Sequence, residues 1–456
     1  MKVLMYGWEF PPHFTGGLGI ACYGIVHGLL TNKIEVALVL PQNPSLPEHN
    51  ASGFQSINTP FSILSIHSLL KPYIDEKRYQ EQLALDLIHM TELVSRPANT
   101  IPYPVVPAKA GIHVQLDQNT TTGMDPHFRG DDTKVPTLQD EALVEYSDNL
   151  VGEVRRYAAL ASRHALQTPH DVIHSHDWLT ILAGIEARRL SGKPLIFQVH
   201  ALEIDRSDED LNQDIFRIEH YGLHAADHIV AVSHYTKNRI IERYGIAAEK
   251  ITVSYNGLFR HQRPQKDVSI VSKNPLKTVL FLGRLTYQKG VFYFIEAARR
   301  ILETRNDIQF VIAGEGDLLS SAIEQVAHLK LGTNIHFTYF LDRESVSKIY
   351  HLSDVYVMPS ISEPFGIACL EALEHHVPVI ISKQSGVSEI LDCMMTVDFW
   401  DTELLKKRIV ELIDEPEIKK QLLANIDEKL DHLSWEKMTQ NIVNCYSNLI
   451  HQTSIQ

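Results

Sequence analysis

Apolar residues along this chain fall into two patterns that alternate. Short apolar runs bounded by polar residues or glycine predict buried strands, and longer stretches with apolar residues three and four positions apart predict helices. The expected strands of a first series are 2–8, 35–40, 171–176, 194–200, 228–233 and 251–257, and those of a second series are 278–285, 308–316, 335–340, 355–360 and 377–382. Two such series predict an α/β fold with two doubly wound, Rossmann-like domains. Ligands of these sheets bind at the carboxyl ends of the strands, which places the expected site in a cleft between the domains.

Three segments depart from this alternation. Residues 97–137 are rich in Pro, Gly, Asn, Asp and Thr and have no apolar period, which predicts a loop insertion, and a long helix is expected after it at 138–166. Residues 260–276 also lack a period and are interpreted as a linker between domains. We therefore predict an N-terminal domain at 1–262, a C-terminal domain at 263–432, and a C-terminal helix within 433–456 that packs back toward the N-terminal domain.

Composition and charge narrow the classes of function. The chain has 456 residues, too many for one hydrophobic core, and a formal net charge of −14, which suits neither nucleic acid nor an anionic membrane surface. Its four cysteines form no CxxC pair, so neither a disulfide framework nor a cysteine zinc site is indicated. An N-terminus that reaches proline quickly, and the lack of any apolar run of spanning length, predict a cytoplasmic protein without a stable membrane anchor.

Two cations follow the first strand of the second series. Arg284 and Lys289 are five residues apart in the turn after that strand, and two fixed cations there suit a diphosphate. Gly314 and Gly316, after the next strand, would let the backbone approach a ligand closely. Solvated surface charges and ordinary turn glycines are the alternative interpretations of these residues.

The stretch SEPFGIACLEAL, residues 362–373, joins an expected strand to an expected helix. Pro364 stands near the helix start, where its missing N–H group has no consequence. The helix dipole and the free backbone amides there would favour a phosphate, and the residues that carry these amides are Phe365, Gly366 and Ile367. The absence of a side chain at Gly366 leaves room for that phosphate.

Two glutamates flank this expected phosphate position. Glu371 lies about 7.5 Å along the helix axis at about 1.5 Å per residue, which matches the distance from a phosphate to the ribose of the same nucleotide. Glu363 precedes the helix and would face a sugar at the other end of the diphosphate. The pattern predicts a grip on both ends of a nucleotide-sugar, with two solvated glutamates as the alternative.

These motifs resemble those of retaining glycosyltransferases with the GT-B architecture of two Rossmann domains. EPFGIACLE resembles their E-x7-E signature, GRLTYQKG resembles their Arg-to-Lys segment, and a closing SWE helix follows. The resemblance implies that Gly16 and Gly17 form a glycine loop at the donor phosphates and that His176 matches the cleft histidine of glycogen and starch synthases. It implies the catalytic residues His176, Arg284, Lys289 and Glu363, and the donor-binding residues Gly16, Gly17, Gly314, Phe365, Gly366, Ile367 and Glu371.

The similarity is greatest to family 4 glycosyltransferases and bacterial glycogen-synthase-like enzymes. It implies transfer of a hexosyl unit, with glucose expected, from a nucleotide-diphosphate sugar to a carbohydrate acceptor such as an α-glucan. The implied donors are UDP-glucose and ADP-glucose, with no cofactor and no metal ion. Bacterial starch synthases carry KTGGLGDV where this chain reads FTGGLGIA, so Phe14 and Ile20 leave the donor base and strict glycogen synthase activity open.

Other functions fit parts of the same pattern. A hexosyltransferase acting on a lipid or polysaccharide precursor would share the E-x7-E signature, as would a trehalose-type synthase or a phosphorylase. A metallohydrolase is the alternative from another class, because His174 and His176 form an HxH pair on one face of a strand. Near these histidines, Asp177 and Trp178 are expected to cap and pack the next helix, and His200 and Glu203 to lie on the acceptor side.

Overall fold

The computed structural model describes residues 1–11, 17–42, 57, 59–67, 150–207, 210–259 and 276–453. Residues 1–73 and 147–456 belong to one compact unit that contains both sheets. The predicted insertion at 97–137, Phe14, Gly16 and residues 260–275 of the predicted linker lie outside the described residues.

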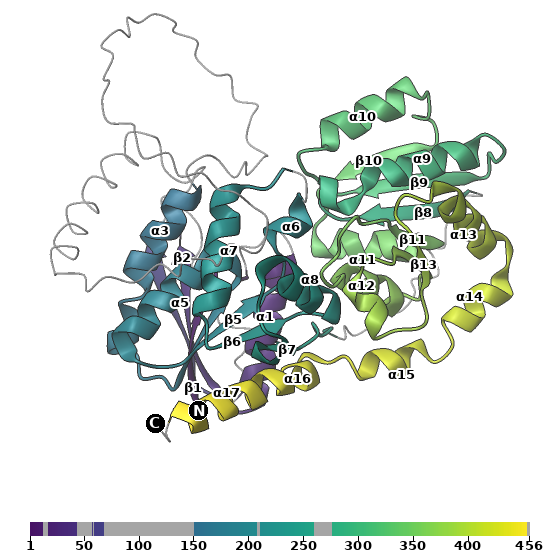
Figure 1. Ribbon diagram of the computed structural model, residues 1–456. Coiled ribbons are helices and arrows are strands. Elements are labelled where there is room, and N and C mark those ends of the chain that lie inside the picture. The colour runs from purple at the N-terminus through teal and green to yellow at the C-terminus, as the bar shows by residue number, and fades with distance from the viewer. Residues whose placement is uncertain are drawn as a thin grey trace, which may run out of the picture. The chain divides into compact units, whose positions relative to one another are not determined.

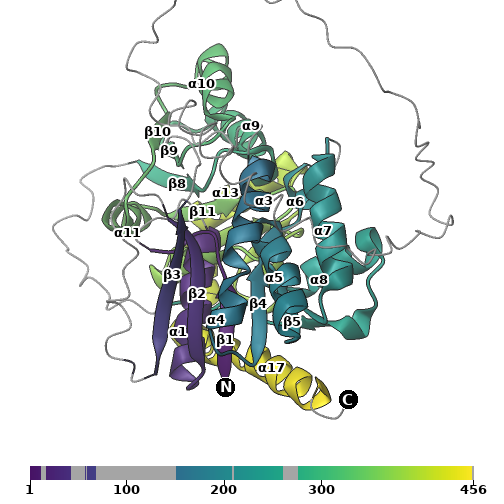
Figure 2. The same cartoon turned by 90° about the vertical axis from the view of Figure 1, so that its left-hand side faces the viewer.

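The first sheet is parallel throughout, with the strand order β3-β2-β1-β4-β5-β6-β7 within the described residues (Figure 2). Its strands are β1 (Lys2–Tyr6), β2 (Glu35–Gln42), β3 (Phe61–His67), β4 (Val172–His176), β5 (Leu195–Val199), β6 (His228–Ala231) and β7 (Ile251–Val253). Its helices are α1 (Gly17–Thr31), α3 (Leu150–Ala161), α4 (His164–Gln167), α5 (Asp177–Ser191), α6 (Glu203–Arg206), α7 (Gln213–Ala225) and α8 (His234–Tyr244).

The second sheet is also parallel, with the described strands in the order β10-β9-β8-β11-β12-β13 (Figure 1). Its strands are β8 (Lys277–Leu282), β9 (Ile308–Ala313), β10 (Ile335–Tyr339), β11 (Val355–Met358), β12 (Val379–Ser382) and β13 (Met395–Val397). The helices that follow these strands are α9 (Val291–Leu302), α10 (Leu319–His328), α11 (Arg343–His351), α12 (Ile367–Glu374), α13 (Thr402–Asp414), α14 (Pro416–Leu422) and α15 (Ile426–Asp431).

Each sheet buries both of its faces, which explains the continuous apolar runs in the sequence. In β1, Leu4 and Tyr6 face a core formed with α3 and α5, while Val3 and Met5 face a second core formed with α1. In β8, Val279 packs against α9 and α13, and Leu280 packs against α12 on the other face. Helices on both faces of two parallel sheets confirm the prediction of two Rossmann-like domains.

The C-terminal segment continues past the second sheet and packs against the first. It forms α16 (Trp435–Met438) and α17 (Gln440–Thr453), so the single helix expected here is interrupted at Thr439. Trp435 and Tyr446 are buried in the same cluster as β1 and α1, and Figure 1 shows α17, in yellow, beside the start of β1. The long helix predicted at 138–166 is also wrong in its described part, because α3 ends at Ala161 and α4 begins at His164.

All four cysteines are buried thiols outside any disulfide. No helix among the described residues combines the length and the apolar character needed to cross a membrane.

Candidate functional site

Both sheets reverse their strand order at one point, and the predicted site residues gather at these points. The order changes direction between β1 and β4 in the first sheet and between β8 and β11 in the second. Gly17 begins α1 after β1, and His176 ends β4. Lys289 follows β8, and Glu363 follows β11. The carboxyl ends of strands beside such a reversal are where open α/β sheets bind their ligands.

The structure brings Lys289 and Glu363 into direct contact. Lys289 Nζ lies 2.6 Å from Glu363 Oε2, and Ser360 Oγ donates to the same oxygen at 3.2 Å. The glutamate is buried, with 6% of its surface exposed, while the lysine is half-buried. A buried carboxylate needs a partner of this kind, because an unpaired charge in the interior is strongly destabilising.

Glycines in the second domain bring two loops together. Arg284 is exposed after β8, and a Cβ atom at Gly314 would lie 2.1 Å from the carbonyl oxygen of Gly283. Leu285 N donates to Glu315 O at 2.8 Å, which ties the two loops by backbone contact. Gly314 therefore makes room for the neighbouring backbone, so close packing of loops accounts for this glycine without a ligand.

The start of α12 offers three backbone donors. Among the described residues, the N–H groups of Phe365, Gly366 and Ile367 have no hydrogen-bond acceptor. Gly366 has φ +106°, and a Cβ atom there would lie 3.1 Å from Met358 Cε and 3.4 Å from Glu363 Cγ. A side chain at this position would be both strained and crowded. Glycine thus keeps the backbone of this turn, with its unpaired donors, next to Glu363.

Glu371 lies one turn inside α12 and is half-buried. Burial, and then the charge of this carboxylate, raise the pKa of Tyr350 far above its ordinary value. Glu371 is thus near Tyr350, and the predicted contact with a ribose stays a prediction.

Three histidines meet at the ends of β4 and β5. The rings of His174 and His176 stack with their centroids 4.5 Å apart, and His176 Nδ1 lies 2.9 Å from His200 Nε2. His174 Nδ1 contacts the hydroxyl of Tyr446, on α17, at 2.5 Å. His176 Nε2 is buried and has no hydrogen-bond partner among the described residues.

Burial keeps these imidazoles neutral. It lowers the pKa of His174 to about 3, with a smaller contribution from His200. It also holds the pKa of His176 well below its ordinary value, assisted by the two neighbouring rings. Burial lowers the pKa of His200 as well, against an opposing effect of Asp177. A neutral His176 can form a hydrogen bond to a sugar hydroxyl without adding charge to the site.

The residues next to these histidines have structural roles that the sequence only partly predicted. Trp178 is buried as expected, but the prediction that Asp177 caps α5 is wrong. The backbone at Asp177 has φ +54°, and its Oδ1 accepts from His200 N at 2.7 Å instead. Glu203 is buried, and its Oε1 accepts from Asn212 N at 3.1 Å, which leaves that oxygen engaged within the fold.

In a metal site at the predicted HxH pair, His174 and His176 would be two of the ligands. His174 and His176 are stacked face to face, and one nitrogen of His174 already contacts Tyr446. In the part of the chain that the structure describes, no group of three or more His, Cys, Asp or Glu residues could hold a metal ion.

Two family models match this chain. Glycosyltransferase Family 4 matches residues 108–259, beginning within the predicted insertion, and Glycosyl transferases group 1 matches residues 262–429. An uncharacterized glycosyltransferase of Methanocaldococcus jannaschii is 26% identical over 463 residues, which cover 98% of each chain. Alpha-maltose-1-phosphate synthase of Mycolicibacterium smegmatis is 29% identical over 60% of this chain and 78% of its own. Glycogen synthase of Mycobacterium tuberculosis is 29% identical over 48% of this chain and 53% of its own.

Solved structures share the fold over nearly the whole chain. Sucrose-phosphate synthase from Thermosynechococcus elongatus has a TM-score of 0.69 at 16% identity, with 99% of each chain covered. Anabaena HepE in complex with UDP and glucose has a TM-score of 0.61 at 16% identity, with 98% of this chain and 99% of that chain covered.

Proposed function

Since this chain is a glycosyltransferase of the GT-B, group 1 and family 4 type, we propose that it transfers glucose with retention from a nucleotide-diphosphate glucose to an α-glucan. The observation that carries this proposal is the Lys289–Glu363 pair beside the unpaired N–H groups at the start of α12. Cationic and N–H donors would hold the diphosphate there, and a carboxylate would face the sugar.

The leaving diphosphate needs positive partners, which the chain supplies at the ends of β8 and β11. Lys289, Arg284 and the N–H groups of Gly366 and Ile367 would share its charge. By analogy with oxyanion donors, each contact would contribute about 2–4 kcal/mol to transition-state stabilisation. No step in this scheme requires a metal ion, and the donor is a substrate rather than a cofactor.

Glu363 and His176 would act on the sugar. The donor diphosphate would compete with Glu363 for Lys289, because both bring negative charge to one ammonium group. The released carboxylate would then orient the sugar and stabilise positive charge at the anomeric carbon without forming a covalent bond. His176 Nε2, which has no partner among the described residues, would bond a hydroxyl of that sugar.

The relatives support glucose as the transferred unit. Glycogen synthase and alpha-maltose-1-phosphate synthase are named for glucosyl products, and HepE was solved with UDP and glucose. The longer match to the maltose-1-phosphate synthase, over 78% of that protein, favours a sugar phosphate as a second candidate acceptor. Transfer to a lipid or cell-surface polysaccharide precursor is the further alternative within this class.

A nucleotide-release assay on the purified protein tests this function. UDP-glucose, ADP-glucose, GDP-mannose and UDP-N-acetylglucosamine are crossed with glycogen, maltooligosaccharides, glucose 1-phosphate and no acceptor. We expect release from a glucose donor that rises with the glucan, together with chain extension. Release that depends on glucose 1-phosphate alone would move the acceptor to a sugar phosphate. If elemental analysis finds stoichiometric bound zinc and activity requires it, the metallohydrolase would be supported instead.

A further inference from the structure

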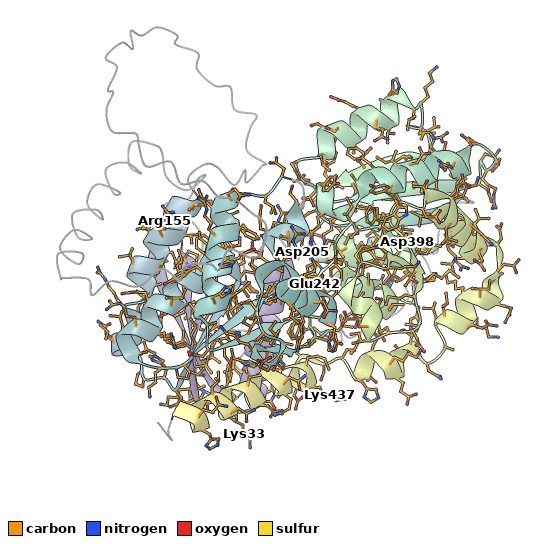
Figure 3. The ribbon with its side chains drawn as sticks, in the orientation of Figure 1. Lys33, Arg155, Asp205, Glu242, Asp398 and Lys437 are labelled. Carbon is orange, nitrogen blue, oxygen red and sulfur yellow. The ribbon has the colours of Figure 1, made fainter. Side chains whose placement is uncertain are left out.

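The residue before Glu363 is hydrogen-bonded to the first sheet domain. Ser362 Oγ donates to Asp205 Oδ1 at 2.7 Å, and the hydroxyl of Tyr235 lies 2.9 Å from the same Ser362 oxygen. Because the single Ser362 proton goes to the carboxylate, Tyr235 is the donor in the second bond. Asp205, which Figure 3 labels, lies on α6, and Tyr235 lies in the first turn of α8.

These partners are held in place by their own contacts. Asp205 Oδ2 accepts from Leu202 N at 2.8 Å, and Arg239 Nε forms an ion pair with Asp205 Oδ1 at 3.0 Å. The first two N–H groups of α8, those of His234 and Tyr235, donate to the carboxylate of Glu389 at 2.8 and 2.6 Å. Asp205 and Ser362 are both buried, so water does not compete for their bond.

The residue after Glu363 is also bonded to α8. Ser233, which caps the start of α8, donates from Oγ to the carbonyl oxygen of Pro364 at 2.6 Å. Between these two bonds, Glu363 N donates to Gln384 O at 2.8 Å, and Glu363 O accepts from Gly386 N at 3.0 Å. The glutamate is thus fixed on both sides along the chain, and both outer partners come from the first sheet domain.

The Arg284-to-Lys289 loop is hydrogen-bonded to the same serine. Gln288 Nε2 donates to the carbonyl oxygen of Ser362 at 2.9 Å, and Gln288 immediately precedes Lys289. Ser362 therefore contacts the first sheet domain through its hydroxyl and the Arg284-to-Lys289 loop through its carbonyl oxygen. A shift of Ser362 would therefore move Glu363 and, at the same time, weaken the Gln288 hydrogen bond that holds the loop next to Lys289.

We propose that Ser362, Asp205 and Tyr235, which we call the latch, are positioning residues. They hold Glu363 in its catalytic position while the two sheet domains are in contact. This assignment rests on the proposed function of Glu363. The latch makes no contact with the reacting atoms itself. When the domains separate, the Ser362 bonds break and Glu363 loses part of its support. The catalytic carboxylate is then correctly placed only when the two domains are in contact.

The test compares kcat and KM for the glucose donor in Ser362→Ala, Ser362→Thr, Asp205→Asn, Tyr235→Phe and the double variant Ser362→Ala/Asp205→Asn. We expect Ser362→Ala to lower kcat about 10- to 100-fold while KM for the donor changes less than about threefold. Ser362→Thr keeps the hydroxyl and should recover most of kcat. The losses caused by Ser362→Ala and Asp205→Asn should be less than multiplicative in the double variant, because Asp205→Asn weakens the Ser362 bond as well as the ion pair with Arg239. Ser191→Ala, which removes a hydroxyl bonded to Ala187 O on α5, is the matched control.

A folded Ser362→Ala variant with kcat within twofold of the wild type overturns the assignment. The assignment is also overturned if Ser362→Ala lowers kcat, Ser362→Thr does not restore it, and Tyr235→Phe leaves kcat unchanged. If Ser362→Ala fails to fold, Tyr235→Phe decides instead, because it removes one bond to Ser362 and leaves the Ser362–Asp205 bond in place. A lowered kcat in Tyr235→Phe supports the assignment, and an unchanged kcat overturns it. Failure of the proposed function would appear as an inactive wild type, whereas failure of the latch would appear as an active Ser362→Ala enzyme.

Discussion

At the scale of single residues, burial distinguishes Glu363 from the acidic residues of exposed ion pairs. Its carboxylate is buried and paired with a half-buried lysine at 2.6 Å. The pair Lys348–Glu344 has the same separation of 2.6 Å, but its side chains are 56% and 78% exposed. An exposed pair contributes little to stability, whereas a buried one constrains where each group sits. Of these two pairs, the buried one is therefore expected to have a role in positioning its groups.

We predict that Glu363→Ala and Lys289→Ala each lower turnover at least about 100-fold, which is the usual effect of losing one preorganised group that stabilises a developing charge. Steady-state nucleotide release with the preferred donor measures it. Lys348→Ala, at the exposed pair, should leave turnover unchanged. Near-normal turnover in either of the first two variants would refute the role of that residue.

Gly366 gives a second prediction at this scale. Alanine there would have to adopt φ +106° and would also crowd Met358, so we expect Gly366→Ala to lower the free energy of unfolding by about 1–3 kcal/mol. Urea denaturation measures the change. Gly245→Ala is the control, because Gly245 has φ +69° but no atom within 4 Å of its added Cβ. An equal loss in both variants would show that crowding at Gly366 has no effect.

At the scale of elements, β4 and β5 bring three buried histidines together and α17 supplies a tyrosine to them. Tyr446 reaches His174 across 272 residues of sequence. The HxH spacing predicted that two of these rings share a face of β4, and the structure has them stacked. It did not predict the contact with His200 or Tyr446, because pairing between a strand and a distant helix depends on tertiary packing.

This histidine group predicts that the protein loses stability in acid. In the unfolded chain His174 titrates near its ordinary value of 6.5, but in the fold its pKa is lowered to about 3. Between these values the unfolded state binds more protons, so the free energy of unfolding falls as the pH falls, by up to about 1.4 kcal/mol per pH unit for each such histidine. Urea denaturation at several pH values from 7 to 4 measures this slope.

The variant His174→Gln should show a shallower decline than the wild type over the same pH range, even if its stability at pH 7 is lower. His432→Gln, which changes an exposed histidine, should keep the slope of the wild type. Identical slopes in all three proteins would mean that acid acts through other groups.

At the scale of the whole molecule, the sequence predicted the two Rossmann-like domains because both sheets are buried on both faces and their strands read as apolar runs. It missed β3 and β13, each of which lies at one of the two edges of its sheet in the described part of the chain. At the site, the Arg-to-Lys segment and the E-x7-E motif pointed to Lys289 and Glu363, which are in contact. Asp205 and Tyr235 had no motif, because their link to Ser362 joins residues 157 and 127 positions apart.

Glucosyl transfer with retention is tested by proton NMR of the anomeric region while the enzyme consumes its glucose donor with maltotriose as acceptor. It reports transfer and stereochemistry together, before mutarotation can mix the anomers of any free sugar. We predict that a new α-glucosidic signal grows in step with nucleotide release and is absent with Glu363→Ala. A β-glucosidic product, or free glucose without any transfer product, would contradict it.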